Sequence, residues 1–208
     1  MTPRENIFDN HNTKRISYII ITKNRANRLN EALISCREYK EIDDELILID
    51  GASTDNTESV VKDFSDIIDI YISDPDKNGI EALNKGLLLA HGKYVKPIGD
   101  SDIFYKDALE KAYEIMESNP EVDLIIPGGI RTRDGKWSGR YMYYPPGTNF
   151  GSSVDDFYKK GRSVSGCGIF FRRKLLSRVG LWEVNSVSPD HCFLIRSISL
   201  GAKIKFCR

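Results

Sequence analysis

Two short acidic segments stand out because each follows an apolar run with the length of a β-strand. Asp50 follows residues 46–49, and Asp100 and Asp102 follow residues 94–98. Carboxylates at the ends of parallel strands lie in the crevice where open α/β sheets bind ligands. An Asp-x-Asp pair in that crevice can hold a divalent cation, Mg²⁺ or Mn²⁺, against phosphate oxygens. The two segments therefore predict a site for a nucleotide-activated donor.

The chain around these carboxylates predicts the elements that position them. Near-continuous apolar runs predict strands at residues 16–22, 46–49, 67–72 and 94–98. Apolar residues at helical spacing predict a helix after each of these strands. Strands that alternate with helices indicate a mostly parallel, doubly wound sheet flanked by helices. We expect an α/β fold of the Rossmann-like type.

The second half of the chain is less regular. We expect helices at 107–118, 172–179 and 190–200, and strands at 123–126, 168–171 and 202–206. Residues 131–150 are rich in Gly, Pro, Tyr and Arg, and such segments supply acceptor loops and extra strands at a sheet edge. With 208 residues, the chain can build one domain with a substantial core. We expect that domain over residues 15–208, after a flexible lead-in over residues 1–14.

Charge and hydropathy argue against several classes of protein. The 30 Lys and Arg residues balance the 30 Asp and Glu residues, so no global charge favours nucleic acid or an anionic membrane as a partner. No run approaches the roughly 18 apolar residues of a membrane-spanning helix. The N-terminus lacks the apolar core of a signal peptide, so we expect a cytoplasmic protein, with peripheral membrane association left open. The four cysteines lack a Cys-x-x-Cys spacing, which favours reduced thiols over a disulfide or a zinc site.

No glycine-rich phosphate loop follows the first predicted strand. Residues 22–25 read Thr-Lys-Asn-Arg, without a Walker or G-x-G-x-x-G pattern. A glycine cradle for phosphate is therefore not expected. Its absence makes a metal ion the more natural partner for the phosphates of a nucleotide.

Four linked motifs resemble family 2 glycosyltransferases of the GT-A fold. Residues 19–25 resemble the opening strand and turn of that family, and residues 49–57 are similar to its D-G-x-S-x-D-x-T segment. Residues 79–87 look like its G-I-x-x-A-x-N-K-G-I helix, and the Asp-x-Asp strand follows. The resemblance implies a GT-A-type single domain, with a nucleotide-binding half over residues 15–105 and an acceptor-binding half over residues 106–208. The sequence leaves open whether residue 208 is a natural end or a truncation.

The resemblance also implies roles in the donor site. The implied nucleotide-binding residues are Thr22, Asn24, Asp50, Asn84, Lys85 and Asp100, and the implied ligands of Mn²⁺ or Mg²⁺ are Asp100 and Asp102. Family members often carry Asp at the position of Ser101, so Asp102 is the surer metal ligand here. The residue types leave other interpretations open: Asp50 as a turn or cap residue, Thr22 bonded to backbone, Lys85 on a solvated face, and Asp100 to Asp102 as a solvated acidic turn.

Sugar transfer to a hydroxyl group needs a base that removes the hydroxyl proton. Asp190 resembles the acidic residue that opens the penultimate helix in the family, although the family's acidic pair is reduced here to Pro189-Asp190. We expect Asp190 to be the catalytic base, with the N-cap of the predicted helix as the alternative role.

Two residues are candidates for contact with the acceptor. Trp182 occupies the place of an aromatic residue in the family's G-x-(W/F)-(D/E) segment and can stack on a sugar, with core packing as the alternative. Arg172 is a further candidate, with a solvated helix start as the alternative.

The predicted function is therefore glycosyl transfer. The chain would move a sugar from a nucleoside diphosphate donor, most often a UDP-sugar in this family, to an acceptor hydroxyl with inversion of the anomeric centre. The acceptor, which could be a glycan, a lipid-linked group or a protein, is not readable from the sequence. Two alternatives stay open: a non-catalytic nucleotide- or glycan-binding member of the same fold, and a nucleotidyltransferase on a similar sheet.

Overall fold

A computed structural model gives the fold for residues 14–100, 102, 106–127, 129–133, 136–142 and 168–207. The predicted lead-in over residues 1–14 therefore lies outside the described residues, except for Lys14, the first residue of β1. The strands of the main sheet are β1 (Lys14–Thr22), β2 (Glu45–Asp50), β3 (Ile70–Ser73), β4 (Gly92–Gly99), β5 (Leu124–Pro127), β8 (Phe170–Arg172) and β9 (Ile204–Cys207). The helices are α1 (Ala26–Tyr39), α2 (Thr57–Asp63), α3 (Gly79–Leu89), α4 (Lys106–Ser118), α6 (Leu175–Val179) and α7 (Pro189–Ser199).

Within the described residues, these strands form one sheet of seven in the order β3-β2-β1-β4-β8-β5-β9. β8 runs antiparallel to both of its neighbours, and the other neighbouring pairs are parallel. The order β3-β2-β1-β4 with a helix after each strand is the doubly wound arrangement. The predicted mostly parallel α/β sheet is confirmed.

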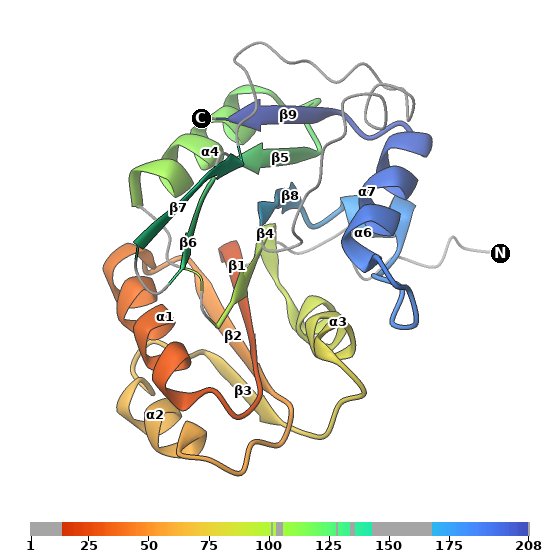
Figure 1. Cartoon of the computed structure of the whole chain (residues 1–208). Coiled ribbons are helices and arrows are strands. Elements are labelled where there is room, and N and C mark those ends of the chain that lie inside the picture. The colour runs from red at the N-terminus through yellow and green to blue at the C-terminus, as the bar shows by residue number, and fades with distance from the viewer. Residues whose placement is uncertain are drawn as a thin grey trace, which may run out of the picture.

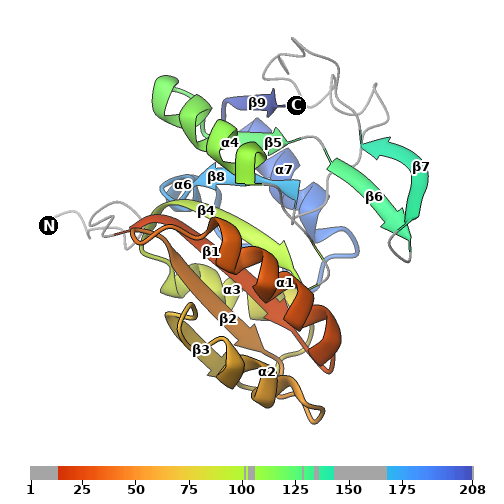
Figure 2. The ribbon, with the colours of Figure 1, turned by 90° about the vertical axis from the view of Figure 1, so that its left-hand side faces the viewer.

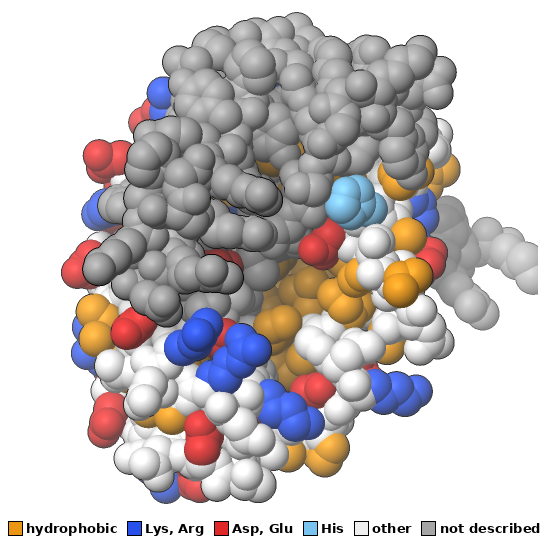
Figure 3. Space-filling view, in the orientation of Figure 1, with side chains coloured by type: hydrophobic (Ala, Val, Ile, Leu, Met, Phe, Trp, Pro, Cys, Tyr) orange, Lys and Arg blue, Asp and Glu red, His pale blue; other side chains and the backbone are white. Residues whose placement is uncertain are grey.

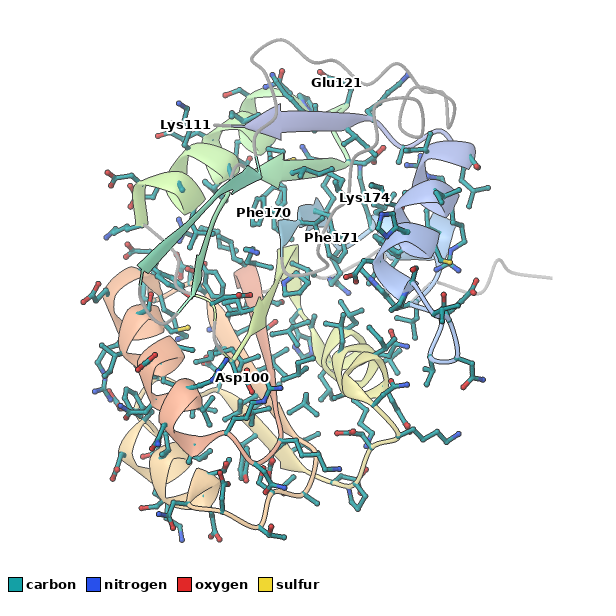
Figure 4. All side chains as sticks on the ribbon, in the orientation of Figure 1. Asp100, Lys111, Glu121, Phe170, Phe171 and Lys174 are labelled. Atoms are coloured by element: carbon teal, nitrogen blue, oxygen red, sulfur yellow. The ribbon has the colours of Figure 1, made fainter. Side chains whose placement is uncertain are left out.

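The sheet separates two layers of helices (Figures 1 and 2). α1, α2 and α4 cover one face, where their buried apolar residues pack in a cluster with Tyr18, Leu48 and Tyr94. α3, α6 and α7 cover the other face, where the core includes Ile19, Ile49 and further apolar residues of the strands. Phe170 and Phe171, labelled on β8 in Figure 4, belong to different clusters because successive strand residues point to opposite faces.

A close approach of α3 to the sheet depends on Gly86. A Cβ atom at this position would lie 2.5 Å from Cγ2 of Ile19 in β1. Only a residue without a side chain lets the helix lie this close. α3 is thereby held against the centre of the sheet, next to the strand ends that carry the predicted site.

Two predicted boundaries and one predicted strand placement differ from the structure. The third strand begins at Ile70, not at residue 67, because Ile67 and Ile68 donate backbone hydrogen bonds to Phe64 in turns after α2. The helix predicted from residue 172 begins at Leu175, since Arg172 is still part of β8. Strands within residues 131–150 were expected at the edge of the main sheet. Instead β6 (Gly129–Arg133) and β7 (Lys136–Met142) form a separate antiparallel hairpin.

None of the helices in the described part of the chain has the length and apolar character required to cross a membrane.

Candidate active site

The sheet brings three side chains of the predicted donor site, together with Ser73, into one row at the carboxyl ends of the strands. Thr22, the last residue of β1, pairs with Asp50, the last residue of β2, and Asp50 pairs with Ser73, the last residue of β3. On the other side of β1, the Thr22 hydroxyl donates a hydrogen bond to Asp100 Oδ2 at 3.2 Å. The row Ser73–Asp50–Thr22–Asp100 thus lies where open parallel sheets bind ligands.

Asp50 is only 2% exposed, and its carboxylate has several donors. The Ser53 N–H and hydroxyl donate at 3.1 and 2.5 Å, the Ser73 hydroxyl at 2.7 Å and the Tyr71 hydroxyl at 3.5 Å. Burial raises the pKa of Tyr71, and the charge of Asp50 adds to that shift, so the phenol stays a donor. Asp50 therefore has the turn-fixing role that the residue type left open. Of these hydrogen bonds, the 3.5 Å contact from Tyr71 is the weakest, so a donor on a ligand could replace it at the smallest cost in free energy.

Asp100 lies directly after β4, in the middle of Figure 4, and is 6% exposed. Besides the Thr22 hydroxyl, its carboxylate accepts a hydrogen bond from Arg25 Nη1 at 3.2 Å. Arg25 keeps 56% of its side chain exposed, so the ion pair is open to solvent on the arginine side. Arg25 is not among the predicted site residues, although it directly follows Asn24 in the first motif.

Asp102 folds back on the end of β4. Its Oδ2 accepts a hydrogen bond from the Gly99 N–H at 2.9 Å, and its own N–H donates to the Gly99 carbonyl at 3.0 Å. Among the described residues, Oδ1 of Asp102 accepts no hydrogen bond. Ser101, between the two carboxylates, lies outside the described residues.

These carboxylates can be tested against the implied metal. In the described part of the chain, no group of three or more His, Cys, Asp or Glu side chains is arranged to hold a metal ion. Mg²⁺ is commonly bound by one or two carboxylates together with substrate phosphates and water, without an all-protein cage. Asp102 Oδ1, which accepts no hydrogen bond from the described residues, and the neighbouring Asp100 carboxylate fit that kind of site.

Asn24 and Asp55 fix the loops around the row. Asn24 has a left-handed backbone (φ 52°), and its Oδ1 accepts from the Thr54 N–H at 2.7 Å, which joins the loops after β1 and β2. Asp55 accepts from the Thr57 N–H and hydroxyl at the start of α2 and from Ala26 N–H at the start of α1. Asp55 therefore serves both helix starts, and the NH₂ group of Asn24 makes no hydrogen bond within the described residues.

Asn84 and Lys85 are engaged elsewhere than the resemblance implied. The Asn84 side chain donates to the Trp182 carbonyl at 2.8 Å and accepts from the Trp182 N–H at 3.1 Å, so both ends of its amide are used. The Lys85 ammonium pairs with Asp74 at 2.5 Å and donates to the Pro75 carbonyl at 2.9 Å. The bond to Asp74 raises the pKa of Lys85. Both side chains hold protein segments, and the expected nucleotide contacts stay predictions.

The two candidates for acceptor contact are interior residues. Trp182 is 3% exposed, and its ring stacks on Phe193 with 3.4 Å between ring centroids. This is the core packing that was the alternative interpretation of Trp182. Arg172 is 6% exposed, and its guanidinium donates to the carbonyls of Val122 and Met116 at 2.7 and 2.5 Å. Its donors are used inside the protein, so nothing in this geometry supports the expected acceptor contact, which stays a prediction.

Asp190 lies in the first turn of α7, one residue after Pro189. The N-cap of this helix is Ser188, so Asp190 does not have the N-cap role that was the alternative. Asp190 is half-buried, and its carboxylate forms no hydrogen bond or ion pair within the described residues. A carboxylate that is not engaged by the protein is able to accept a proton from a bound hydroxyl group.

The face of Figure 1 that carries the strand ends is hollowed (Figure 3). The floor of the hollow is hydrophobic, Lys and Arg side chains gather along its lower border, and an acidic and a His side chain lie at its upper right. A hollow of this kind offers an apolar surface next to cationic groups.

The comparisons with known proteins assign the family. The model of glycosyl transferase family 2 matches residues 17–180. The matched residues include the whole donor row, and Trp182 lies two residues beyond their end. The chain belongs to glycosyl transferase family 2. This family 2 chain is 26% identical to an uncharacterized glycosyltransferase of Rickettsia prowazekii over 203 residues, covering 88% of the chain and 63% of the relative. It thus spans less than two thirds of that relative's length.

Solved structures confirm the GT-A-type fold of this family 2 chain. The structure of TarS residues 1–349 from S. aureus in complex with UDP-GlcNAc matches with a TM-score of 0.75 at 17% identity, over 92% of this chain and 55% of that TarS fragment. The mannosyltransferase PcManGT from Pyrobaculum calidifontis, in complex with GDP-Man and Mn²⁺, matches with a TM-score of 0.69 at 21% identity, over 94% of this chain and 56% of PcManGT.

Proposed function

We propose that this chain transfers a sugar from a nucleoside diphosphate donor, of the UDP class, to an acceptor hydroxyl with inversion of the anomeric centre. Family membership supports glycosyl transfer, and the complex of TarS with UDP-GlcNAc supports a UDP-sugar. The observation that carries the proposal is the row Ser73–Asp50–Thr22–Asp100 at the carboxyl edge of the sheet.

In this proposal, Thr22, Asn24 and Asp50 bind the nucleoside. The Asp50 carboxylate is held rigidly by Ser53 and Ser73, so it is already oriented before a ligand arrives. A ribose hydroxyl or a base N–H would replace the 3.5 Å contact from Tyr71. The NH₂ group of Asn24, which has no partner in the described part of the chain, would add a donor. A preorganised acceptor of this kind costs little ordering when the ligand binds.

Asp102 and Asp100 would hold Mn²⁺ or Mg²⁺ at the diphosphate. The metal, when bound, would neutralise charge that develops on the leaving nucleoside diphosphate. Arg25 already supplies one positive charge to Asp100, and its half-exposed guanidinium can also donate to a phosphate oxygen. The cationic border of the hollow in Figure 3 is consistent with a diphosphate on this face.

Asp190 would act as the base. Its carboxylate would accept the proton of the attacking hydroxyl while that oxygen forms a bond to the anomeric carbon and the bond to the diphosphate breaks. A single displacement of this kind inverts the configuration at carbon. The carboxylate in the first turn of α7 is half-buried and bonds to none of the described residues, which supports the assignment.

The test compares donor binding with donor turnover. We expect UDP with Mn²⁺ to raise the melting temperature of the parent protein, and a panel of UDP-sugars to contain one that is hydrolysed or transferred. Asp190→Asn should keep the nucleotide-dependent shift and lose turnover by at least about a hundredfold, because general base catalysis is worth about 10²–10⁴. Turnover within about tenfold of the parent would exclude Asp190 as the base.

A matched control is Asp66→Asn, which removes an equal charge from an exposed ion pair with Arg37. It should leave both binding and turnover as in the parent protein. Nucleotide binding without turnover of any donor would favour the non-catalytic alternative. Pyrophosphate release from a nucleoside triphosphate would favour a nucleotidyltransferase.

A further inference from the structure

The loop before α7 is held by side chains from two helices that lie on either side of it. Asn84 of α3 donates to the Trp182 carbonyl, and Asn78 donates to the Val184 carbonyl, each at 2.8 Å. Arg196 of α7 donates to the Leu181 carbonyl and bonds the Glu183 carboxylate at 3.0 Å. The bonds from Asn78 and Asn84 connect segments about a hundred residues apart, so they fix how α3 and the loop lie against each other.

The Asn84 amide is matched to one residue of that loop. Its Nδ2 donates to the Trp182 carbonyl, while its Oδ1 accepts from the Trp182 N–H at 3.1 Å. Because both bonds go to the backbone of Trp182, they fix the orientation of that residue relative to Asn84 as well as the distance between them. No other natural side chain of this size supplies a donor and an acceptor in this arrangement, because aspartate lacks the N–H groups.

The loop passes this restraint to α7 through the ring of Trp182. The ring stacks on Phe193 with 3.4 Å between centroids and 7° between planes, and it also contacts Phe171 of β8. Phe193 lies three residues after Asp190, one turn further along the same helix. The backbone of Trp182 is therefore bound to the donor-side helix α3, and its ring is packed on the helix that carries Asp190.

We propose that Asn84 is a positioning residue for sugar transfer: through Trp182 it fixes α7 against α3 and so holds Asp190 at the donor site. This inference rests on the proposed function. It assigns Asn84 to the transfer step and not to nucleotide affinity. A misplacement of about 1 Å at a reacting group can cost about a hundredfold in rate, so the loss of one amide can be large in turnover and small in binding.

Asn84→Asp is the sharpest variant because it keeps the shape and the acceptor of Asn84 and removes only the donor. An ionised carboxylate at this position would repel the Trp182 carbonyl. We expect turnover to fall by about ten- to a hundredfold, while the affinity for UDP with Mn²⁺ stays within about twofold of the parent. Asn56→Asp is the control, since Asn56 makes no side-chain cap bond at the start of α2 and the change adds the same charge.

A second readout does not depend on activity. The chain has two tryptophans, so in a Trp137→Phe background the fluorescence of Trp182 reports its stack on Phe193. Asn84→Asp should change the emission of Trp182. The change should reverse as the pH falls below the pKa of the new carboxyl, because a protonated carboxyl can again donate to the carbonyl. Asn84→Ala should show the change at every pH.

The outcomes separate the inference from the proposed function. The proposed function fails if the parent protein turns over none of the donors. The inference fails if the parent is active and Asn84→Asp keeps its turnover, or if the variant loses nucleotide affinity and keeps the emission of Trp182. The second result would indicate that Asn84 binds the nucleotide, as the family resemblance implied.

Discussion

Replacing Arg172 should destabilise the protein without a specific effect on acceptor use. Its guanidinium donates to the carbonyls of Val122, Met116 and Asn119 at 2.7, 2.5 and 3.2 Å and to the Tyr94 hydroxyl at 3.0 Å. Met116 lies in the last turn of α4, where carbonyls lack a helical donor and a cation is favourable.

The cost of Arg172→Met can be worked from these bonds. Each hydrogen bond to a charged group contributes about 1.5–3 kcal/mol, and a buried polar group left without a partner costs about 1–3 kcal/mol. Because such losses are not additive and the carbonyls can in part find other donors, we expect a total loss of about 3–5 kcal/mol. For a domain of this size, that corresponds to a fall in melting temperature on the order of 10 °C.

Urea unfolding of Arg172→Met beside the parent measures this loss. Arg37→Met is the control, since Arg37 forms an exposed ion pair with Asp66 and its loss should cost at most about 1 kcal/mol. A loss below about 1 kcal/mol for Arg172→Met would refute the buried role derived from the four bonds.

Two further predictions concern the elements around the site. Gly86→Ala should lower the free energy of unfolding by about 1–2 kcal/mol in urea unfolding, because the clash with Ile19 at 2.5 Å costs about 1–3 kcal/mol and the better helix propensity of alanine returns at most about 1. A gain in stability would show that α3 can move away from the sheet freely. The hydrogen bond from Thr57, with that from a backbone N–H, lowers the pKa of Asp55. Its stabilising contribution is therefore present above the ordinary carboxyl pKa and lost as the pH falls through the lowered value in the folded state. The difference in melting temperature between the parent and Asp55→Asn should shrink as the pH is lowered through the acid range, and a difference that does not depend on pH would contradict this assignment.

Much of the fold could be predicted from the sequence because the strands are buried on both faces. Residues 46–49 and 94–98 give apolar runs of strand length, and the structure places strands at both. The errors lie at boundaries that tertiary contacts decide. Ile67 and Ile68 have strand-like side chains, yet their N–H groups bond to Phe64 in a turn, so β3 starts later than the apolar run.

The donor row could be predicted because it follows from where strands end. Thr22, Asp50 and Asp100 each stand at the end of an apolar run, and the register of a parallel sheet brings such ends to one edge. Arg25 could have been included on the same grounds, because it follows the first of these strands. What the sequence does not show is how far a carboxylate such as Asp50 is already engaged by neighbouring hydroxyls.

The roles of Arg172 and Asn84 could not be predicted, and for a common reason. Both residues are polar, and both were predicted to contact a ligand, Asn84 because it lies within the family motif of residues 79–87. The partners that decide their roles are backbone groups distant in the sequence, the carbonyl of Val122 for Arg172 and the N–H and carbonyl of Trp182 for Asn84. Every residue has a backbone carbonyl and every residue except proline has an N–H, so no pattern of side chains in the sequence indicates which of these groups will be the partner. A polar residue in a motif therefore predicts that its position is constrained, while only the fold decides whether a ligand or a distant backbone segment constrains it. If the Asn84 variants behave as expected, this motif position serves transfer by holding two halves of the domain together.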